Sequence, residues 1–325
     1  MPKNDHAKGL LERALSGERL ATARLISIVE DGTSELGAVM GALFPYTGKA
    51  YTIGITGAPG AGKSTLTETL VARIRKDDRR VAVLAVDPSS PFTGGALLGD
   101  RVRMQAHATD PGVFIRSMAT RGHLGGLALA TPEAVRVLDA SGYEYIVVET
   151  VGVGQAEVDI VEAADTTLVV VNPGWGDSVQ AGKAGLLEVA DVFVVNKADR
   201  QGTRQTVAEL KQMLRFRFEL DHEQGMEAPW TPPIVQTVAT ESQGIGELWD
   251  AVSAHREYLE GSGELERKRR SRISKEITDI AVERVRSRVL QDAKSSLESL
   301  VSRVERRELD PYAAAESLMD KLDTT

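Results

Sequence analysis

Short apolar runs alternate with longer amphipathic segments along most of the chain, beginning at Tyr51. Seven of these runs are rich in β-branched residues and have the length of buried strands: YTIGIT, VAVLAVD, VFIRS, YIVVET, TTLVVVN, VFVVNK and PIVQTV. Buried strands that alternate with helices typically form a parallel sheet with helices on both faces. The pattern therefore predicts an α/β fold with a mostly parallel sheet covered on both faces.

The segment before these strands has a helical pattern instead. From Leu10 to Leu43 apolar residues recur at helical spacing, and Gly17 and Gly32 interrupt the series. This pattern predicts a small N-terminal helical extension. We place the extension over residues 1–48 and the main domain over residues 49–258.

The end of the chain is also predicted to be helical. The strand pattern stops after about Leu259, and Gly261-Ser262-Gly263 forms a predicted hinge. In the charged segment that follows, apolar residues at helical spacing form only a narrow stripe: Ile273, Ile277, Ile280, Val285 and Val289. A helix that cannot bury such a stripe within its own chain often packs against a second chain. We therefore expect residues 259–325 to be the dimerisation arm of a homodimer.

Composition and charge limit the partners that this chain can have. Of its 325 residues, 42% are hydrophobic and 26% charged, which is typical of a folded soluble protein. The net charge of -8 argues against nucleic acid as a partner, and the basic run Arg267–Arg270 is interpreted as a solvated helix face. The chain has no cysteine, no secretory signal and no apolar stretch of membrane-spanning length. We expect a cytoplasmic protein without a membrane partner.

The first candidate chemistry lies where the run YTIGIT leads into a G-x-x-x-x-G-K-[ST] sequence. Between a strand and a helix, this sequence is the phosphate-binding loop (P-loop) of nucleotide hydrolases, because its backbone N–H groups converge on phosphate oxygens. Lys63 is expected to reach the terminal phosphates, and Ser64 to ligate magnesium. The predicted nucleotide-binding residues of this loop are Gly57, Ala58, Pro59, Gly60, Ala61, Gly62, Lys63, Ser64 and Thr65.

A second motif indicates guanine rather than adenine. The run VFVVNK ends in Asn196-Lys197-Ala198-Asp199, an N-K-x-D sequence. The Asp199 carboxylate is able to accept hydrogen bonds from guanine N1 and the 2-amino group, and adenine has neither donor there. Asn196 is expected to brace the loop and meet the edge of the base, and the stem of Lys197 to lie across the ring face. The backbone N–H of Ala239, in the later TVAT segment, is a candidate donor to guanine O6.

Two acidic residues end predicted strands between these motifs. Asp87 ends VAVLAVD and Glu149 ends the run before Gly152, so both carboxylates should face the nucleotide and help to hold magnesium. Asp100 is a third candidate magnesium ligand, and the N–H of Gly152 is expected to contact the terminal phosphate. We assign Lys63, Glu149 and Gly152 to the catalytic machinery.

The segment from Glu149 to Gln155 is a candidate switch, and it departs in one respect from that of Ras-like proteins. Those proteins have D-x-x-G followed at once by a glutamine that positions water. Here the acid is Glu149, and Gln155 lies three residues beyond Gly152. This difference predicts slow intrinsic hydrolysis. It leaves the catalytic base unassigned, and the charge-stabilising residue open between Arg101, Arg103 and Arg121.

Together these motifs resemble the MeaB/ArgK family, the GTPase metallochaperones of adenosylcobalamin-dependent acyl-CoA mutases, formerly labelled lysine/arginine/ornithine transport ATPases. The resemblance covers nearly the whole chain. The matching segments are GAPGAGKS, VDPSS, GDRVRM, RGHLGGL, ETVGVGQ, NPGWGD with Gln180 and Lys183, and NKAD.

The resemblance implies a P-loop GTPase domain with helical extensions at both ends and a homodimer joined through the C-terminal arm. It implies GTP and GDP as ligands and Mg²⁺ as cofactor, held by Ser64, Asp87, Asp100 and Glu149. It further implies a mobile loop that couples the GTPase to the mutase, through Asn172, Trp175, Asp177, Gln180 and Lys183. In such a protein GTP hydrolysis gates adenosylcobalamin loading and protects or reactivates methylmalonyl-CoA mutase or a related mutase.

Two other functions were weighed against this one. The older family label suggests a kinase that phosphorylates periplasmic amino-acid-binding proteins, but the sequence has no separate acceptor-binding domain. Nickel insertion, as in related metallochaperone GTPases, requires soft or imidazole ligands. The chain has no cysteine and only five scattered histidines, which disfavours nickel insertion.

Overall fold

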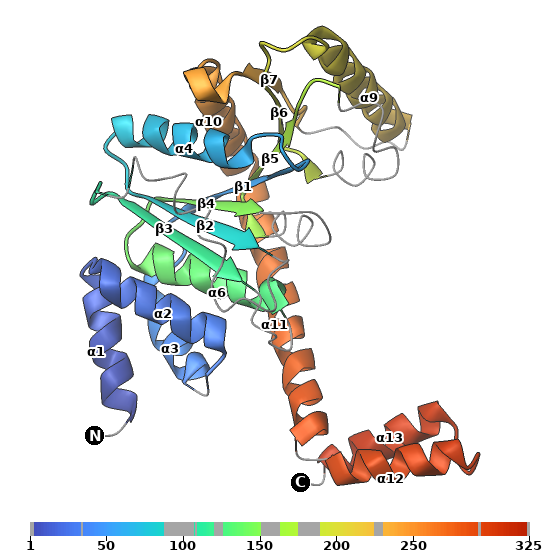
Figure 1. The fold of residues 1–325 in the computed structure, drawn as a ribbon. Helices are drawn as coiled ribbons and strands as arrows, with labels where there is room; N and C mark the ends of the chain where they lie inside the picture. Colours follow the sequence, from blue (N-terminus) through green and yellow to red (C-terminus); the bar gives the residue numbers. More distant parts are fainter. Residues whose placement is uncertain are drawn as a thin grey trace. The chain divides into compact units, whose positions relative to one another are not determined.

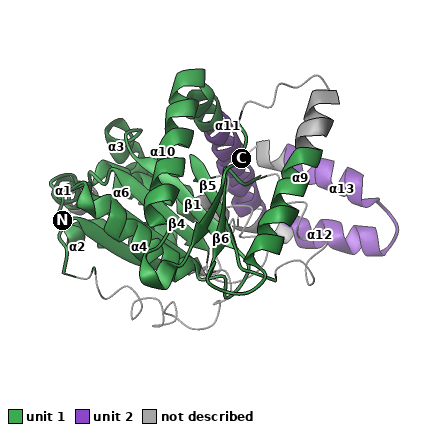
Figure 2. Ribbon diagram, turned by 90° about the horizontal axis from the view of Figure 1, so that it is seen from above, with its two compact units in different colours: residues 1–270 green, residues 271–325 purple. Residues whose placement is uncertain are grey.

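The computed structural model describes residues 3–33, 35–87, 107, 109–119, 126–150, 163–174, 189–223, 230–291 and 294–323. The chain divides into two compact units, Met1–Arg270 and Ser271–Thr325, which Figure 2 colours green and purple. Each unit is described by itself below.

A seven-stranded parallel sheet forms the centre of the first unit, and all seven predicted strands are present (Figure 1). Neighbouring strands follow the order β3-β2-β4-β1-β5-β6-β7, with β1 in the middle. Their bounds are β1 Tyr51–Gly57, β2 Val81–Asp87, β3 Val113–Ala119, β4 Tyr145–Thr150, β5 Thr166–Val171, β6 Val192–Asn196 and β7 Ile234–Thr237. The predicted α/β fold is thus confirmed.

Helices cover both faces of this sheet, as continuous apolar strands require. On one face Ile53 and Ile55 of β1 pack with apolar residues of α4 (Lys63–Lys76) and α10 (Ile245–Ser262). On the other face α6 (Gly126–Ala140) packs against β2, β3 and β4. Further along that second face, α9 (Thr203–Glu223) buries Leu210 against β5 and β6. The rule that successive strand residues point to opposite faces accounts for the two cores.

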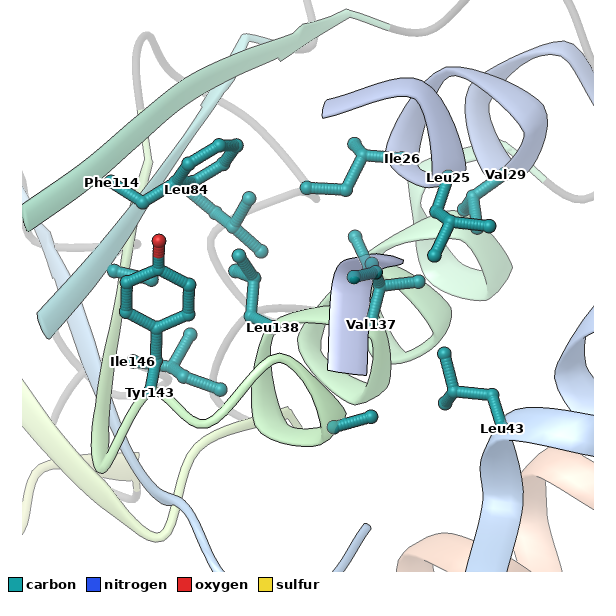
Figure 3. Packing of buried hydrophobic residues seen from close by; sticks show 14 of the residues in the cluster. Leu25, Ile26, Val29, Leu43, Leu84, Phe114, Val137, Leu138, Tyr143 and Ile146 are labelled. Carbon is teal, nitrogen blue, oxygen red and sulfur yellow. The ribbon is translucent and has the colours of Figure 1, made fainter. Parts of the chain in front are cut away.

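The predicted N-terminal helical extension consists of α1 (Lys3–Leu15), α2 (Arg19–Asp31) and α3 (Leu36–Leu43), followed by the short η1 (Phe44–Tyr46). Gly17 and Gly32 lie between these helices with φ of 85° and 54°, a region that glycine adopts without steric cost. Leu25 and Ile26 of α2 pack towards Leu138 of α6 in the cluster that Figure 3 shows. The extension therefore belongs to the core below β2 and β3.

After α10, Gly263 with φ 74° ends the helix, and α11 (Glu264–Gln291) begins at the predicted hinge. The first unit includes α11 up to Arg270. Within it, Lys268 forms an ion pair with Asp191, and Arg269 forms one with Asp165, beside the sheet. The interpretation of the basic run as a solvated face was therefore wrong for these two residues. Arg267, by contrast, is 66% exposed.

The second unit contains the rest of α11, then α12 (Lys294–Glu305) and α13 (Pro311–Asp323). Leu300 of α12 and Leu318 of α13 are its buried centre. Three residues of the predicted apolar stripe on α11 are exposed, Ile273 (45%), Ile277 (64%) and Val285 (38%), whereas Val289 packs against the cluster of Leu300 and Leu318. Within the described part of the chain, no helix is both long and apolar enough to cross a membrane.

Candidate functional site

The candidate site lies at the carboxyl ends of β1, β4 and β6; β4 adjoins β1 in the sheet, and β5 lies between β1 and β6. In an open parallel sheet, ligands bind outside these ends, where the strand order reverses. Chain order reverses at β1, because β4 lies on one side of it and β5 on the other. The loop after β1, which carries the P-loop sequence, therefore occupies the expected place.

The glycines of the P-loop are required by the backbone. At Gly57, φ is 134°, and a Cβ would lie 2.0 Å from the backbone oxygen of Val170 in β5. Gly62 precedes α4 in the left-handed region at φ 92°, and a Cβ there would lie 2.4 Å from Nδ2 of Asn196. A residue with a Cβ at position 57 would displace the loop from β5, and one at position 62 would displace it from the guanine motif.

The P-loop lysine is held inside the loop. Lys63 begins α4, is 7% exposed, and donates through Nζ to the backbone oxygens of Gly57 at 2.6 Å and Ala58 at 3.3 Å. These carbonyl contacts stabilise a positive charge in a nearly dry position. The ammonium group therefore lies where the loop encloses bound phosphate in P-loop proteins.

Ser64 and Glu149 form the second part of the site. The Ser64 hydroxyl donates to Oε1 of Glu149 at 2.6 Å. Glu149 is 1% exposed because β4 lies between β1 and β2, with Ile55 and Ala85 as its register partners. A hydroxyl and a carboxylate are hard oxygen ligands, so this pair fits a magnesium ion.

The guanine motif is tied directly to the P-loop. Asn196 at the end of β6 donates through Nδ2 to the Ala61 backbone oxygen at 2.8 Å, and Lys197 donates through Nζ to that of Gly60 at 2.6 Å. Lys197 adopts a left-handed φ of 59°, which turns the chain sharply after the strand. Asp199 follows with an exposed side chain. The expected bracing role of Asn196 is consistent with these contacts.

Beside this motif, Oδ1 of Asn196 accepts hydrogen bonds from the Thr237 hydroxyl at 3.1 Å and from the Ala239 backbone N–H at 3.2 Å. Ala239 is thus close to the guanine motif, as the sequence indicates. Sequence reasoning did not include Thr237. Its signal was its place two residues before Ala239, at the end of a predicted strand.

Several predicted site residues lie outside the described part of the chain. Asp87 ends β2, beside Glu149 of β4, but its side chain lies outside the described set, and so do Asp100 and Gly152. Asn172 follows β5, and its Nδ2 donates to the Pro173 backbone oxygen at 3.4 Å. The remaining predicted coupling residues lie outside the described residues: Trp175, Asp177, Gln180 and Lys183.

Comparison with known proteins agrees with this geometry. A family model described as methylmalonyl-CoA mutase-associated GTPase MeaB matches residues 22–294. A putative GTPase of Pyrococcus abyssi is 52% identical over 314 residues, which are 96% of each chain. The mitochondrial methylmalonic aciduria type A homolog of Mus musculus is 37% identical over 228 residues, 68% of this chain and 52% of that protein.

One solved structure is similar along its whole length. It is described as an LAO/AO transport system kinase, and it superposes with a TM-score of 0.70 at 26% identity, covering 99% of both chains. The α/β fold of this chain is thus that of a known structure.

Proposed function

The chain belongs to the family of methylmalonyl-CoA mutase-associated GTPases, and we propose that its GTP hydrolysis serves an adenosylcobalamin-dependent acyl-CoA mutase. In this proposal the GTPase gates cofactor loading and protects or reactivates methylmalonyl-CoA mutase or a close relative. The family match over residues 22–294 is the observation that carries the proposal. The mouse relative named for methylmalonic aciduria is consistent with it.

The phosphate side of the site has a defined role for each residue. Backbone N–H groups between Gly57 and Thr65, except at Pro59, which has none, surround the phosphates, and Lys63 exchanges its carbonyl contacts for the terminal phosphate oxygens. Ser64 and Glu149 would hold Mg²⁺ together with Asp87 and Asp100. When bound, the metal ion neutralises the charge that develops between the β- and γ-phosphates. Gly152 contacts the γ-phosphate through its backbone N–H.

The base side selects guanine. Asp199 accepts from N1 and the 2-amino group, the Lys197 stem covers the base, and the Ala239 N–H donates to O6. The contacts of Asn196 with Ala61 and of Lys197 with Gly60 support this assignment, because they hold the guanine motif against the P-loop. A guanine bound there is therefore positioned relative to the phosphates.

Coupling to the mutase belongs to the segment after β5, with Asn172, Trp175, Asp177, Gln180 and Lys183 as its contact residues. The C-terminal arm joins two copies into a homodimer, and the exposed apolar stripe on α11 supports this part of the proposal. We place the complex in the cytoplasm.

A cofactor-loading experiment tests the proposed role. Adenosylcobalamin binding to apo-methylmalonyl-CoA mutase would be followed spectroscopically with the protein and GTP, GDP or a non-hydrolysable GTP analogue. We expect loading to depend on which nucleotide is present, and Lys63→Ala to abolish that dependence. Loading that is identical with all nucleotides and with the variant would refute the gating role.

A second candidate is the kinase activity after which the similar solved structure is named. It predicts transfer of the γ-phosphate to a periplasmic amino-acid-binding protein. Labelled GTP incubated with such a protein would distinguish the two functions, because a GTPase chaperone releases all the label as inorganic phosphate.

A further inference from the structure

Thr237 is the last residue of β7 and holds the guanine motif from behind. It pairs with Asn196 in the β6–β7 register, and its backbone oxygen accepts from the Ala198 N–H at 3.0 Å. Its hydroxyl donates to Oδ1 of Asn196 at 3.1 Å. Thr237 is 1% and Asn196 2% exposed, so water does not replace these contacts.

The hydrogen bonds of Asn196 are fully used on this side. An amide oxygen has two lone pairs, and Oδ1 accepts from the Thr237 hydroxyl and from the Ala239 N–H at 3.2 Å. With two donors at Oδ1, the Nδ2 group must point the other way, where it donates to the Ala61 oxygen at 2.8 Å. The two donors therefore fix the amide orientation that braces the P-loop.

The Ala239 N–H has two competing uses. This N–H can donate one hydrogen bond at full strength. In this structure the acceptor is Oδ1 of Asn196, and in the proposed guanine site the acceptor is O6. If the N–H passes to guanine, Oδ1 of Asn196 keeps one donor, the Thr237 hydroxyl. Without that hydroxyl, binding guanine would leave a buried amide oxygen unpaired.

We propose that Thr237 is a positioning residue for guanine recognition: its hydroxyl keeps Asn196 paired and oriented while the Ala239 N–H passes from Asn196 to guanine O6. This inference rests on the proposed contact between Ala239 and O6. It predicts a penalty that depends on the ligand. Loss of the hydroxyl weakens the binding of a base with a strong acceptor at position 6 more than that of a base without one.

The test compares GDP with 6-thioguanosine diphosphate on Thr237→Val and on Thr237→Ser. The thio analogue keeps N1–H and the 2-amino group but has a weak sulfur acceptor in place of O6. Valine has the shape of threonine without the hydroxyl, and serine keeps the hydroxyl. Dissociation constants are measured by calorimetry on the full chain, so a partly unfolded sample lowers the stoichiometry rather than the constant.

We expect Thr237→Val to weaken GDP about tenfold and the thio analogue about twofold or less, because the unpaired oxygen arises only when O6 takes the N–H. Thr237→Ser should restore GDP affinity to within about threefold of wild type. Equal losses for both ligands, or no loss with GDP, would overturn the role of Thr237 and leave the guanine site intact. If the wild type itself binds both ligands equally, the Ala239–O6 contact fails, and the inference fails with it.

Discussion

Asp199 lies at the end of the loop in which Asn196 and Lys197 hold the P-loop. In the proposed site its carboxylate accepts from two donors of guanine. Replacing one of these acceptor oxygens by a donor should therefore change which base the site prefers. Asp199→Asn presents an amide donor, which matches the 2-oxo group of xanthine. We predict at least about a hundredfold weaker GDP binding and a preference for XDP over GDP. Competition binding with both nucleotides measures this, and an unchanged preference for GDP would remove Asp199 from the base site.

A buried series of polar contacts links α10, β5 and β1 with Asp191, the residue before β6, at the other end of the strands. His255 of α10 lies 3.3 Å from Asp191 through Nε2 and 2.8 Å from the Thr166 hydroxyl through Nδ1. A carboxylate only accepts, so Nε2 carries the proton and Nδ1 accepts from Thr166. The Thr166 oxygen then accepts from the Tyr51 hydroxyl at 2.5 Å.

Burial lowers the pKa of His255 to about 4, against an ordinary value of 6.5, although nearby Asp191 acts in the opposite direction. Between these pH values the unfolded chain binds the proton and the folded chain does not, so folding stability is complete above pH 6.5 and falls towards pH 4. We predict that this group alone removes about 2 kcal/mol between pH 7 and pH 5.

Urea unfolding of the wild type and of His255→Gln at both pH values isolates this contribution from that of the carboxylates. The variant lacks the titrating ring, so the stability difference between the two proteins should shrink by about 2 kcal/mol at the lower pH. A constant difference would show that the pKa of His255 is the same in the folded and the unfolded chain.

At the residue scale the sequence predicted what its motifs specify. Lys63, Ser64 and Asn196 meet at one edge of the sheet because motif spacing and strand ends determine their places. Thr237 and His255 could not be found this way. Their roles depend on partners that are distant in sequence, such as Asn196 and Thr166, and a single threonine or histidine has no pattern that names its partner.

At the scale of elements, the turn between β7 and α10 shapes the guanine side of the site. Val238 and Gln243 form an antiparallel bridge, and Gly244 follows at φ 74°, where a Cβ would lie 2.1 Å from the Gln236 backbone oxygen. We predict that Gly244→Ala destabilises the fold by about 3 kcal/mol, through backbone strain and displacement of β7.

Gly246 provides the matched control two residues later, because a Cβ there meets nothing within 4 Å. Gly246→Ala should be neutral or stabilising by up to about 1 kcal/mol, as expected inside a helix. Thermal and urea unfolding of both variants measure the difference. Equal effects at the two positions would contradict the close approach of Gly244 to β7.

The first turns of α11 are attached to the amino ends of the strands. Arg269 donates to Asp165 at 2.8 Å and to the backbone oxygens of Gly48 and Ala50 at 3.0 and 2.9 Å. Asp165 is 1% exposed and also accepts from the Thr52 N–H, so removing Arg269 takes the guanidinium away from a buried carboxylate. The Arg269 side chain is 30% exposed, so solvent screens part of this interaction. We predict that Arg269→Ala lowers the free energy of unfolding by about 2 kcal/mol.

Arg267 on the same helix serves as its control. Its side chain is 66% exposed and pairs with Glu264 across one turn, so Arg267→Ala should change stability by less than about 0.5 kcal/mol. Urea unfolding curves compare the two. An effect of Arg269→Ala as small as that of Arg267→Ala would mean that α11 is not anchored through Asp165.

The ion pair of Arg269 with Asp165 also explains why the elements were easier to predict than the contacts between them. The seven strands follow from β-branched runs, which have few alternatives in a buried sheet. The basic run Arg267–Arg270 looks uniform in sequence, yet Lys268 and Arg269 meet carboxylates that precede β6 and β5. Only the fold brings those carboxylates to the helix, so periodicity could not reveal this attachment.

At the scale of the whole molecule, the first unit combines a GTPase sheet with the N-terminal helices in one core, and the second unit presents an exposed apolar stripe on α11. The two ends of the strands carry different groups of residues. The carboxyl ends hold the predicted nucleotide site, and the amino ends hold the buried series of polar contacts and the start of α11.

In the proposed function this GTPase acts on an adenosylcobalamin-dependent mutase. The most direct test is GTP turnover by the purified protein with magnesium, alone and with stoichiometric methylmalonyl-CoA mutase, and with ATP as the control nucleotide. We predict slow hydrolysis alone, since Gln155 is displaced from the position that follows Gly152, and marked acceleration by the mutase for GTP only. A GTP turnover rate that the mutase leaves unchanged would contradict the claim.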